Sequence, residues 1–426
     1  MEVGDYKIEA KDTGCIHNRV LTHIVEHSLP TLELSCWQTC IKNEYASLIR
    51  RHLVNGPEIE DQKLEGMRAV ACALASEVGK TVKLTHDQLC RISPKHMVKK
   101  FKRIKNIILD PKKHRYVHAF IKGEPHTLKC DCGEKEAACG GTDLCKAPRM
   151  IQFRCTLFVY LMAMFLKPIE KRLCSLELTD NHGYRCSVKG LNQKERAQLL
   201  YDIHQAYPHY EMVNLDASVF DGSVRKEHLK YIEHELYRLC NNSRFFSMMM
   251  DMQLENVCFT MNGIYYRGKG KRMSGDPNTS LGNTIINYCA LRVAFGPTAV
   301  IIVDGDDAVV FKNPENPVDL TGLGFNYKAE EVTRFEDFDF CQSKPVFTPK
   351  GWVMCREPVR AISRLLVKIG RLMRDHRSYL LTVGVGEGHV SSYMPMLAHL
   401  AKKLRELGVG GKVIPNWMTY LMKQER

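Results

Sequence analysis

The sequence predicts an α+β fold, and three patterns point to it. The β-branched runs Ile301–Val303 and Ala308–Val310 flank a short acidic turn, which is typical of an antiparallel hairpin. Met212–Leu215 indicates another strand, which ends at Asp216. Apolar residues recur at helical spacing between these strands and over much of the C-terminal part. We therefore expect antiparallel strands backed by helices.

Composition narrows the class of partner. Lys and Arg number 61 against 48 Asp and Glu, which gives a net charge of +13 over 426 residues. This surplus favours polyanions, nucleic acid before membrane. The 17 cysteines are scattered and no secretory signal is visible, so we expect a reducing compartment. The longest apolar run, Leu157–Leu166, is too short to span a bilayer, so no membrane span is expected.

A basic helix is expected between Ser93-Pro94 and Asp110-Pro111. Its apolar face would comprise Met97, Phe101, Ile104 and Ile108, with lysines and Arg103 over the rest. The basic face either meets solvent or contacts phosphates, and the sequence favours neither alternative.

A cysteine-rich insert follows the strand-like segment Ala119–Ile121 and Lys122. Four thiols could hold zinc tetrahedrally: Cys130, Cys132, Cys139 and Cys145. Their spacing is irregular, with Cys-x-Cys in place of Cys-x-x-Cys. Free thiols in a loop are therefore the alternative, and metal analysis of the purified protein separates the two.

Lys146–Arg154 interleaves basic and apolar residues, as in a strand with one charged face. If that face turns into a cleft, Lys146, Arg149 and Arg154 would bind triphosphate or backbone phosphate. The alternative is an exposed basic edge strand.

Two acidic centres stand out. Asp216 ends its strand, and Asp221 follows at the start of a helix, where it could equally be an N-cap. Asp306 and Asp307 lie side by side at the hairpin tip. Adjacent carboxylates repel, so a divalent cation is expected to compensate them, although a solvated turn is the ordinary alternative.

A helix is expected to begin at Asp276-Pro277, after the flexible Ser274-Gly275. Thr279, Asn283 and Asn287 recur every fourth residue and form a polar stripe. Such a stripe needs partners if it is buried, because unpaired amides are costly; otherwise it faces water. Arg292 interrupts the apolar face, so the helix is expected to leave the core there.

The part after about residue 350 is predicted to be helical, with a basic stripe of Arg356, Arg360, Arg364 and Lys368. Gly384–Gly388 resembles a phosphate loop but lacks its Lys-Ser/Thr context, so we interpret it as a plain loop.

Carboxylate centres on two strands can bind two divalent metals about 3.5–4 Å apart. Such a pair activates a ribose 3′-hydroxyl and stabilises a pyrophosphate leaving group, and magnesium suits carboxylates combined with phosphate oxygens. The basic strand would neutralise the triphosphate. Asp221 and Asn283 could form the hydrogen-bonded pair that recognises a ribose 2′-hydroxyl.

Taken in order, these motifs resemble those of the RNA-dependent RNA polymerases of positive-strand RNA viruses, most closely the tombusvirus-like group. Asp216-x4-Asp221 is similar to motif A, Ser274-Gly275-x3-Thr279-x3-Asn283 to motif B, and Gly305-Asp306-Asp307 to motif C. Phe120–Glu124 and Lys146–Arg154 are similar to the two parts of motif F, and Phe340–Pro345 to motif E. The ordered set covers roughly residues 120–345 and is far more specific than any one motif.

The resemblance implies a right-hand fold. Its parts would be an N-terminal extension with some of the fingers (1–90), fingers (91–205 and 241–273), palm (206–240 and 274–348) and thumb (349–426). It also implies site residues. Asp216, Asp306 and Asp307 would hold two Mg²⁺ or Mn²⁺ ions, and Lys328 would protonate pyrophosphate. Nucleotide contacts would come from Lys122, Lys146, Arg149, Arg154, Asp221, Ser274, Gly275, Thr279 and Asn283.

The implied partners are an RNA template, nascent RNA and NTPs. Such polymerases usually work in membrane-associated replication complexes of the host cytoplasm, so other viral proteins would supply the membrane attachment. Two departures stand out: the cysteine-rich insert separates the halves of motif F, and neither motif G nor a priming loop is recognisable.

Three alternatives remain open. A reverse transcriptase shares the metals, but Gly305 and the Asp221/Asn283 pair argue against it; comparing NTP with dNTP incorporation decides. A non-catalytic RNA-binding protein with a decayed polymerase fold would have tolerated loss of its aspartates, which are intact. A two-metal nuclease would not need the Ser-Gly, Thr, Asn helix.

Overall fold

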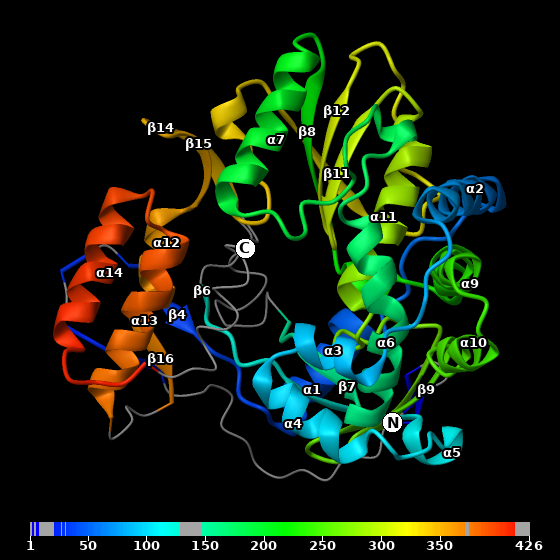
Figure 1. Ribbon diagram of the computed structural model, residues 1–426, viewed down its shortest axis with the longest axis horizontal. Helices are drawn as coiled ribbons and strands as arrows, with labels where there is room; N and C mark the ends of the chain where they lie inside the picture. The colour runs from blue at the N-terminus through cyan, green and yellow to red at the C-terminus, as the bar shows by residue number, and fades with distance from the viewer. Residues whose placement is uncertain are drawn as a thin grey trace.

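The computed structural model describes residues 21–26, 28–29, 31–127, 147–370 and 375–413, and the backbone of 2–3 and 6–7 (Figure 1). Its elements include β1 (Glu2–Val3), β2 (Tyr6–Lys7), α1 (Ile41–Ser47), α3 (His86–Ile92), α5 (Pro111–His114), α6 (Thr156–Leu173), η3 (Thr179–Asn181), α10 (Arg244–Asp251) and η5 (Phe335–Asp337). No helix in the described part of the chain is both long and apolar enough to cross a membrane.

The central sheet has four antiparallel strands in the order β11-β12-β8-β13. They are β8 (Glu211–Ala217), β11 (Val300–Asp304), β12 (Asp307–Lys312) and β13 (Tyr327–Val332). The expected hairpin is confirmed: β11 and β12 join through a two-residue turn, and Asp304 pairs with Asp307. The prediction of an α+β fold with an antiparallel sheet is therefore confirmed.

Helices cover both faces of the central sheet, and strand alternation divides the core between them. Ile301 and Val303 pack with α2 (Asp61–Val78), α9 (His234–Cys240) and α11 (Thr279–Phe295). Val300 and Ile302 point the other way, into a cluster with α7 (Gln193–Ala206). Figure 1 shows the strands between α7 and α11. This double cover holds the strand ends rigidly.

A second sheet, which we call the lateral sheet, has the order β10-β9-β5-β7. Its strands are β5 (Tyr116–Ile121), β7 (Met150–Arg154), β9 (Glu255–Thr260) and β10 (Tyr265–Lys269). The β5–β9 pair is parallel and the other two pairs are antiparallel. The predicted basic strand is thus an edge strand of this sheet.

The C-terminal part contains both strands and helices: β14 (Ser343–Thr348), β15 (Gly351–Arg356), α12 (Pro358–Leu365), β16 (Val367–Ile369), α13 (His376–Val390) and α14 (Pro395–Leu407). The predicted basic stripe is therefore divided among β15, α12 and β16. An N-terminal strand, β3 (Leu21–His23), pairs with β16, and β4 (Leu34–Ser35) pairs with β6 (His126–Thr127) near the lateral sheet. The N-terminal segment thus links the C-terminal helices to the rest of the molecule.

Three local predictions were wrong. Gly384–Gly388 is part of helix α13, where its glycines admit a close neighbour: a Cβ on Gly384 would lie 2.8 Å from the Ala401 carbonyl oxygen of α14. The basic helix α4 (Lys95–Ile104) ends early, leaving Ile108 87% exposed. Arg292 stays in the core, because its guanidinium donates to the carbonyl oxygens of Gly296 and Ala299 and to Asn181 Oδ1.

Candidate active site

Four charged residues form one row across the central sheet. Asp304 of β11 pairs with Asp307 of β12, which pairs with Asp216 of β8, which pairs with Lys328 of β13. Residues directly opposite one another on neighbouring strands present their side chains on the same face, with Cα atoms about 4.5–5.5 Å apart. Two aspartates from distant parts of the sequence are thereby placed side by side at the strand ends.

The turn that carries Asp306 is held from below by helix α11. Gly305 has a φ of 71°, a conformation that glycine adopts without strain. Its N–H donates to the Thr284 hydroxyl at 3.0 Å, while the Asn287 amide donates to the carbonyl oxygens of Gly305 and Asp306, both at 3.1 Å. Asn287 in turn accepts a hydrogen bond from the hydroxyl of Tyr327. Asn287, the last residue of the polar stripe on α11, is therefore buried and fully paired.

Burial and mutual repulsion raise the pKa values of this acidic group. The pKa of Asp307 is raised to about 7, first by burial and then by the carboxylates of Asp306 and Asp216. Asp306 lines a cavity between the central and lateral sheets, yet burial and then the Asp221 carboxylate raise its pKa too. Asp304 differs, because Arg196 of α7 lies 3.4 Å from its carboxylate. Asp306 and Asp307 thus carry the charge that calls for a cation.

Asp221 lies in the short helix α8 (Phe220–Ser223) and is no N-cap; Val219 occupies that position with a φ of 54°, which is rare for a β-branched residue. Its carboxylate accepts a hydrogen bond of 2.7 Å from the Asn283 amide of α11. The expected Asp221–Asn283 pair is therefore formed. Asn283 Oδ1 accepts in turn from Arg272 Nε at 2.9 Å.

The segment before α11 is fastened to the lateral sheet. The Ser274 hydroxyl donates to the Met150 carbonyl at 2.7 Å and accepts from the Gln152 N–H at 3.2 Å. The Gly275 N–H donates to the Gln152 carbonyl, and a Cβ on Gly275 would lie 2.6 Å from that oxygen. The Thr279 hydroxyl likewise donates to the carbonyl oxygens of Met273 and Asp276. These hydroxyls hold the loop in place.

Three cationic side chains line the same cavity as the carboxylates. Lys122 and Arg149 both line it, and Glu124 lies 2.6 Å and 3.4 Å from their nitrogens. Arg51 also lines it, which the sequence did not indicate. Its pKa is lowered by burial first and by the charge of Arg149 second. Arg51 comes close because residue 222 is glycine: a Cβ there would lie 1.8 Å from the Arg51 carbonyl oxygen.

Arg154 does not take the predicted place at the phosphates. It alternates with Met150 and Gln152 on the buried face of β7, and its side chain is 0% exposed. Its Nε donates to Asp276 at 2.8 Å, and its guanidinium lies over the Phe158 ring. The period of two along a strand explains the error, since residues 149 and 154 are an odd number apart and face opposite ways.

Lys328 lies opposite Asp216 but is not among the residues that line the cavity. Lys146 and the four cysteines predicted to bind zinc, Cys130, Cys132, Cys139 and Cys145, lie outside the described residues. Within the described ranges, no three His, Cys, Asp or Glu side chains are already gathered into a metal site.

The cavity between the central and lateral sheets has a volume of about 740 Å³. Its lining includes five carboxylates (Asp216, Asp221, Asp304, Asp306, Asp307), three cations (Arg51, Lys122, Arg149) and the polar side chains of Ser274, Thr279 and Asn283. Buried His52 also lines the wall, and burial lowers its pKa to about 3, so it is neutral. The cavity therefore suits an anionic ligand, with cations bound between it and the carboxylates.

The comparison with known families shows which family the chain belongs to. A family model described as viral RNA dependent RNA polymerase matches residues 16–409. The chain belongs to this family. The match spans both sheets and the C-terminal helices, as well as the motifs from which the resemblance was drawn.

Curated relatives agree. The RNA-directed RNA polymerase of oat chlorotic stunt virus is 28% identical over 344 residues, covering 74% of this chain and 44% of that protein. Those of carnation ringspot virus and tobacco necrosis virus are each 30% identical, over 69% and 61% of this chain, and each match covers 38% of the viral protein. The chain therefore spans less than half the length of these relatives.

Proposed function

We propose that this chain is an RNA-directed RNA polymerase, which copies a viral RNA by transferring nucleotides from NTPs to an RNA 3′-hydroxyl. The observation that carries the proposal is the meeting of the Asp216–Asp307 pair, Asp306 and the Asp221–Asn283 pair in one cavity with three cations. Family membership supports it. In this proposal the central sheet belongs to the palm, the lateral sheet to the fingers and the helices after residue 350 to the thumb.

The residues fit two Mg²⁺ or Mn²⁺ ions. Asp216, Asp306 and Asp307 offer oxygen ligands, and the raised pKa of Asp307 indicates negative charge that a cation would relieve. Mg²⁺ commonly takes only one or two protein carboxylates and completes its shell with water and substrate phosphates, so a preformed cage of three ligands is not required. When bound, the ions would lower the pKa of the attacking 3′-hydroxyl and neutralise the leaving pyrophosphate.

The chain's own groups would hold the nucleotide. Lys122, Arg149 and Arg51 line the cavity together with the carboxylates and are suited to the triphosphate, Arg149 and Arg51 as planar donors and Lys122 as a point charge. The Asp221 carboxylate can accept from the ribose 2′-hydroxyl while the second N–H of Asn283 donates to it. Lys328, in register with Asp216, is the lysine that we propose as proton donor to pyrophosphate.

The partners and location are proposed on the same basis. An RNA template and product would supply the polyanion that a net charge of +13 favours. Attachment to membrane-associated replication complexes in the host cytoplasm would come through other viral proteins. The cysteine-rich insert is kept as a proposed zinc site.

A synthesis assay with purified protein, a primed RNA template, Mg²⁺ and four NTPs tests the function. Labelled product must require template, NTPs and metal, and must be lost on chelation. A preference for dNTPs would indicate a reverse transcriptase, and shortening of the template a nuclease. Binding of RNA without synthesis would indicate a decayed fold.

A further inference from the structure

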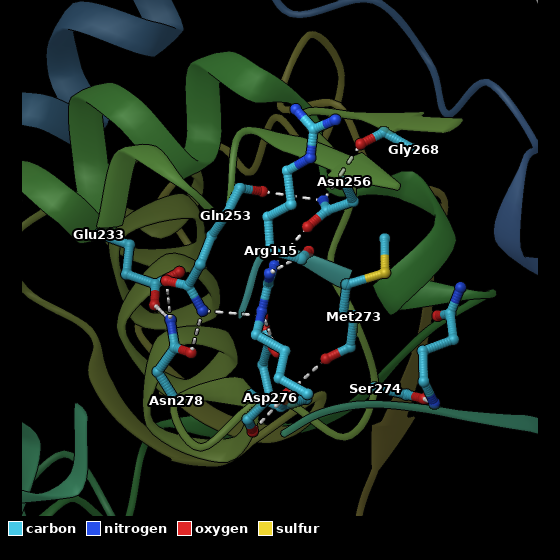
Figure 2. Close-up of polar contacts among 12 residues, drawn as sticks. Arg115, Glu233, Gln253, Asn256, Gly268, Met273, Ser274, Asp276 and Asn278 are labelled. Carbon is cyan, nitrogen blue, oxygen red and sulfur yellow. Dashed lines mark hydrogen bonds and ion pairs between the residues drawn. The ribbon is translucent and has the colours of Figure 1, made fainter. Parts of the chain in front are cut away.

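A chain of buried polar residues runs from the Asp221–Asn283 pair to the lateral sheet. Beyond Arg272 it continues through Glu233, Asn278, Gln253 and Asp276 to Arg154. Figure 2 shows Glu233, Asn278 and Gln253 turned toward one another, with Asp276 and Asn256 beside them. Every member from Asn283 to Arg154 is at most 8% exposed. Between Asn283 and Arg154, the carboxylates of Glu233 and Asp276 balance the guanidinium groups of Arg272 and Arg154, so this stretch is neutral.

Glu233 holds in place the part of this polar chain that leads to the cavity. It lies at the last residue of η4 (His228–Glu233), outside all the recognised motifs, and is 0% exposed. One carboxylate oxygen accepts from Arg272 Nη2 and the other from the Asn278 amide. Residue 282 of α11 is a glycine, and a Cβ there would lie 2.4 Å from the Glu233 carboxyl group. The helix thus leaves room for this carboxylate.

Arg272 determines which way the Asn283 amide faces. A guanidinium has donors only, so the side-chain oxygen of Asn283 must turn toward Arg272 Nε, which leaves the NH₂ group for Asp221. A reversed amide would set its oxygen against the Asp221 carboxylate. Burial lowers the pKa of Arg272, but the charge and hydrogen bond of Glu233, with smaller contributions from Tyr237 and Asp221, raise it on balance. Glu233 therefore keeps a charged donor in position.

We infer that Glu233 is a positioning residue for sugar selection, which acts through Arg272 to fix the orientation of the Asn283 amide. The inference rests on the proposed role of Asp221 and Asn283 as ribose contacts. Glu233 reaches neither the cavity nor the substrate. Its removal should weaken recognition of the 2′-hydroxyl more than it weakens the reaction itself.

Glu233→Gln tests this, because the amide sets an N–H group against Arg272 or Asn278 and removes the charge that holds Arg272. The measurement is kcat/KM for an NTP and for its 2′-deoxy analogue on one primed template. We expect the NTP:dNTP ratio to fall roughly threefold to tenfold, the discrimination that one hydrogen bond supplies, mainly through a higher KM for the NTP. A purely structural loss would lower both values together and leave the ratio unchanged.

The matched control is Glu387→Gln in α13, which also removes a buried carboxylate from an arginine pair, with Arg356, but outside the cavity. Its ratio should equal that of the wild type. If Glu233→Gln does not fold, the double variant Glu233→Gln, Arg272→Gln removes both charges, leaves no buried ion unpaired and should show the same lower ratio.

Asn283→Ala, measured in parallel, separates the role of Glu233 from the role of the Asp221–Asn283 pair. A lower ratio in Asn283→Ala with an unchanged ratio in folded Glu233→Gln would overturn the inference about Glu233 alone. An unchanged ratio in Asn283→Ala would overturn the ribose role of the pair, and the inference with it. A wild-type protein that incorporates no nucleotide would overturn the proposed function and both conclusions that depend on it.

Discussion

Asp216 and Asp307 lie directly opposite each other on β8 and β12, with Asp306 in the adjoining turn. The register between two strands that are 90 residues apart along the chain thus creates the acidic centre. Because each carboxylate disfavours ionisation of its neighbour, the site is poised to gain a cation.

Substitution of the central carboxylates should abolish synthesis without unfolding the protein. Asp216→Asn and Asp306→Asn each remove a ligand and a like charge at almost constant shape, so we expect incorporation to fall about 10³-fold while Tm holds or rises. Primer extension and thermal unfolding are the measurements. Asp337→Asn, at an exposed carboxylate paired with Arg334, is the control. Synthesis by either variant close to the wild-type rate would contradict the assignment of these carboxylates as metal ligands.

The raised pKa of Asp307 predicts a pH effect in metal-free protein. Folded Asp307 keeps its proton up to about pH 7, whereas in the unfolded chain the group ionises near its usual value of 3.8. The folded state therefore binds more protons in this window, and its stability should fall as pH rises from about 4 to 7. Thermal unfolding in chelator, compared with Asp307→Asn, isolates this contribution.

Added Mg²⁺ should reverse that loss at pH 8, because a ligand that binds only the folded state stabilises it. The same addition should have less effect at pH 5, where a proton occupies Asp307. Wild type and Asp307→Asn with identical pH profiles in chelator would contradict the prediction.

Arg51 should contribute to binding of the triphosphate. We expect Arg51→Gln to raise the KM for NTPs roughly tenfold with a smaller change in kcat, since one charge-assisted contact is lost. Steady-state kinetics with varied NTP concentration measures it. Arg50→Gln, at the exposed neighbour within η1 (Leu48–His52), is the control and should keep the wild-type KM. Equal effects of the two variants would argue for a general loss of positive charge.

Gly222 should tolerate no side chain. A methyl group would meet the Arg51 carbonyl at 1.8 Å, so Gly222→Ala must displace η1 from α8, at a cost of about 1–3 kcal/mol in the free energy of unfolding. Denaturant unfolding measures the loss. Gly388→Ala in α13 is the control, because the nearest atom to its Cβ is 3.8 Å away and alanine favours a helix. A Gly222→Ala protein as stable as the wild type would disprove the close contact.

Local patterns were enough for the elements that carry the carboxylates. The β-branched runs around Gly305-Asp306 predicted the hairpin. The spacing of Thr279, Asn283 and Asn287 left open whether the stripe is buried or faces water; in the structure Asn283 pairs with Asp221, and Asn287 with Gly305 and Asp306. For the hairpin, the residues that determine the structure are close neighbours in sequence.

Contacts between distant segments could not be predicted in this way. Arg51 reaches the cavity because a glycine 171 positions later lets two backbones touch. Arg292 stays buried because Asn181 and two carbonyl groups accept from it. The glycines of α13 looked like a loop because the helix that requires them, α14, follows only later in the chain. The place of Arg154, by contrast, could have been found by counting strand alternation.

The pairing of β3 with β16 has a consequence for how the protein is made. Thr22 donates to the carbonyl of Gly370, a separation of 348 residues. At ordinary synthesis rates the N-terminal strand therefore waits about 20–70 s on the ribosome before its partner exists. During that time its unpaired edge is available to wrong partners. We expect the lateral and central sheets to form first. The β3–β16 pair should form last, after translation has passed residue 370.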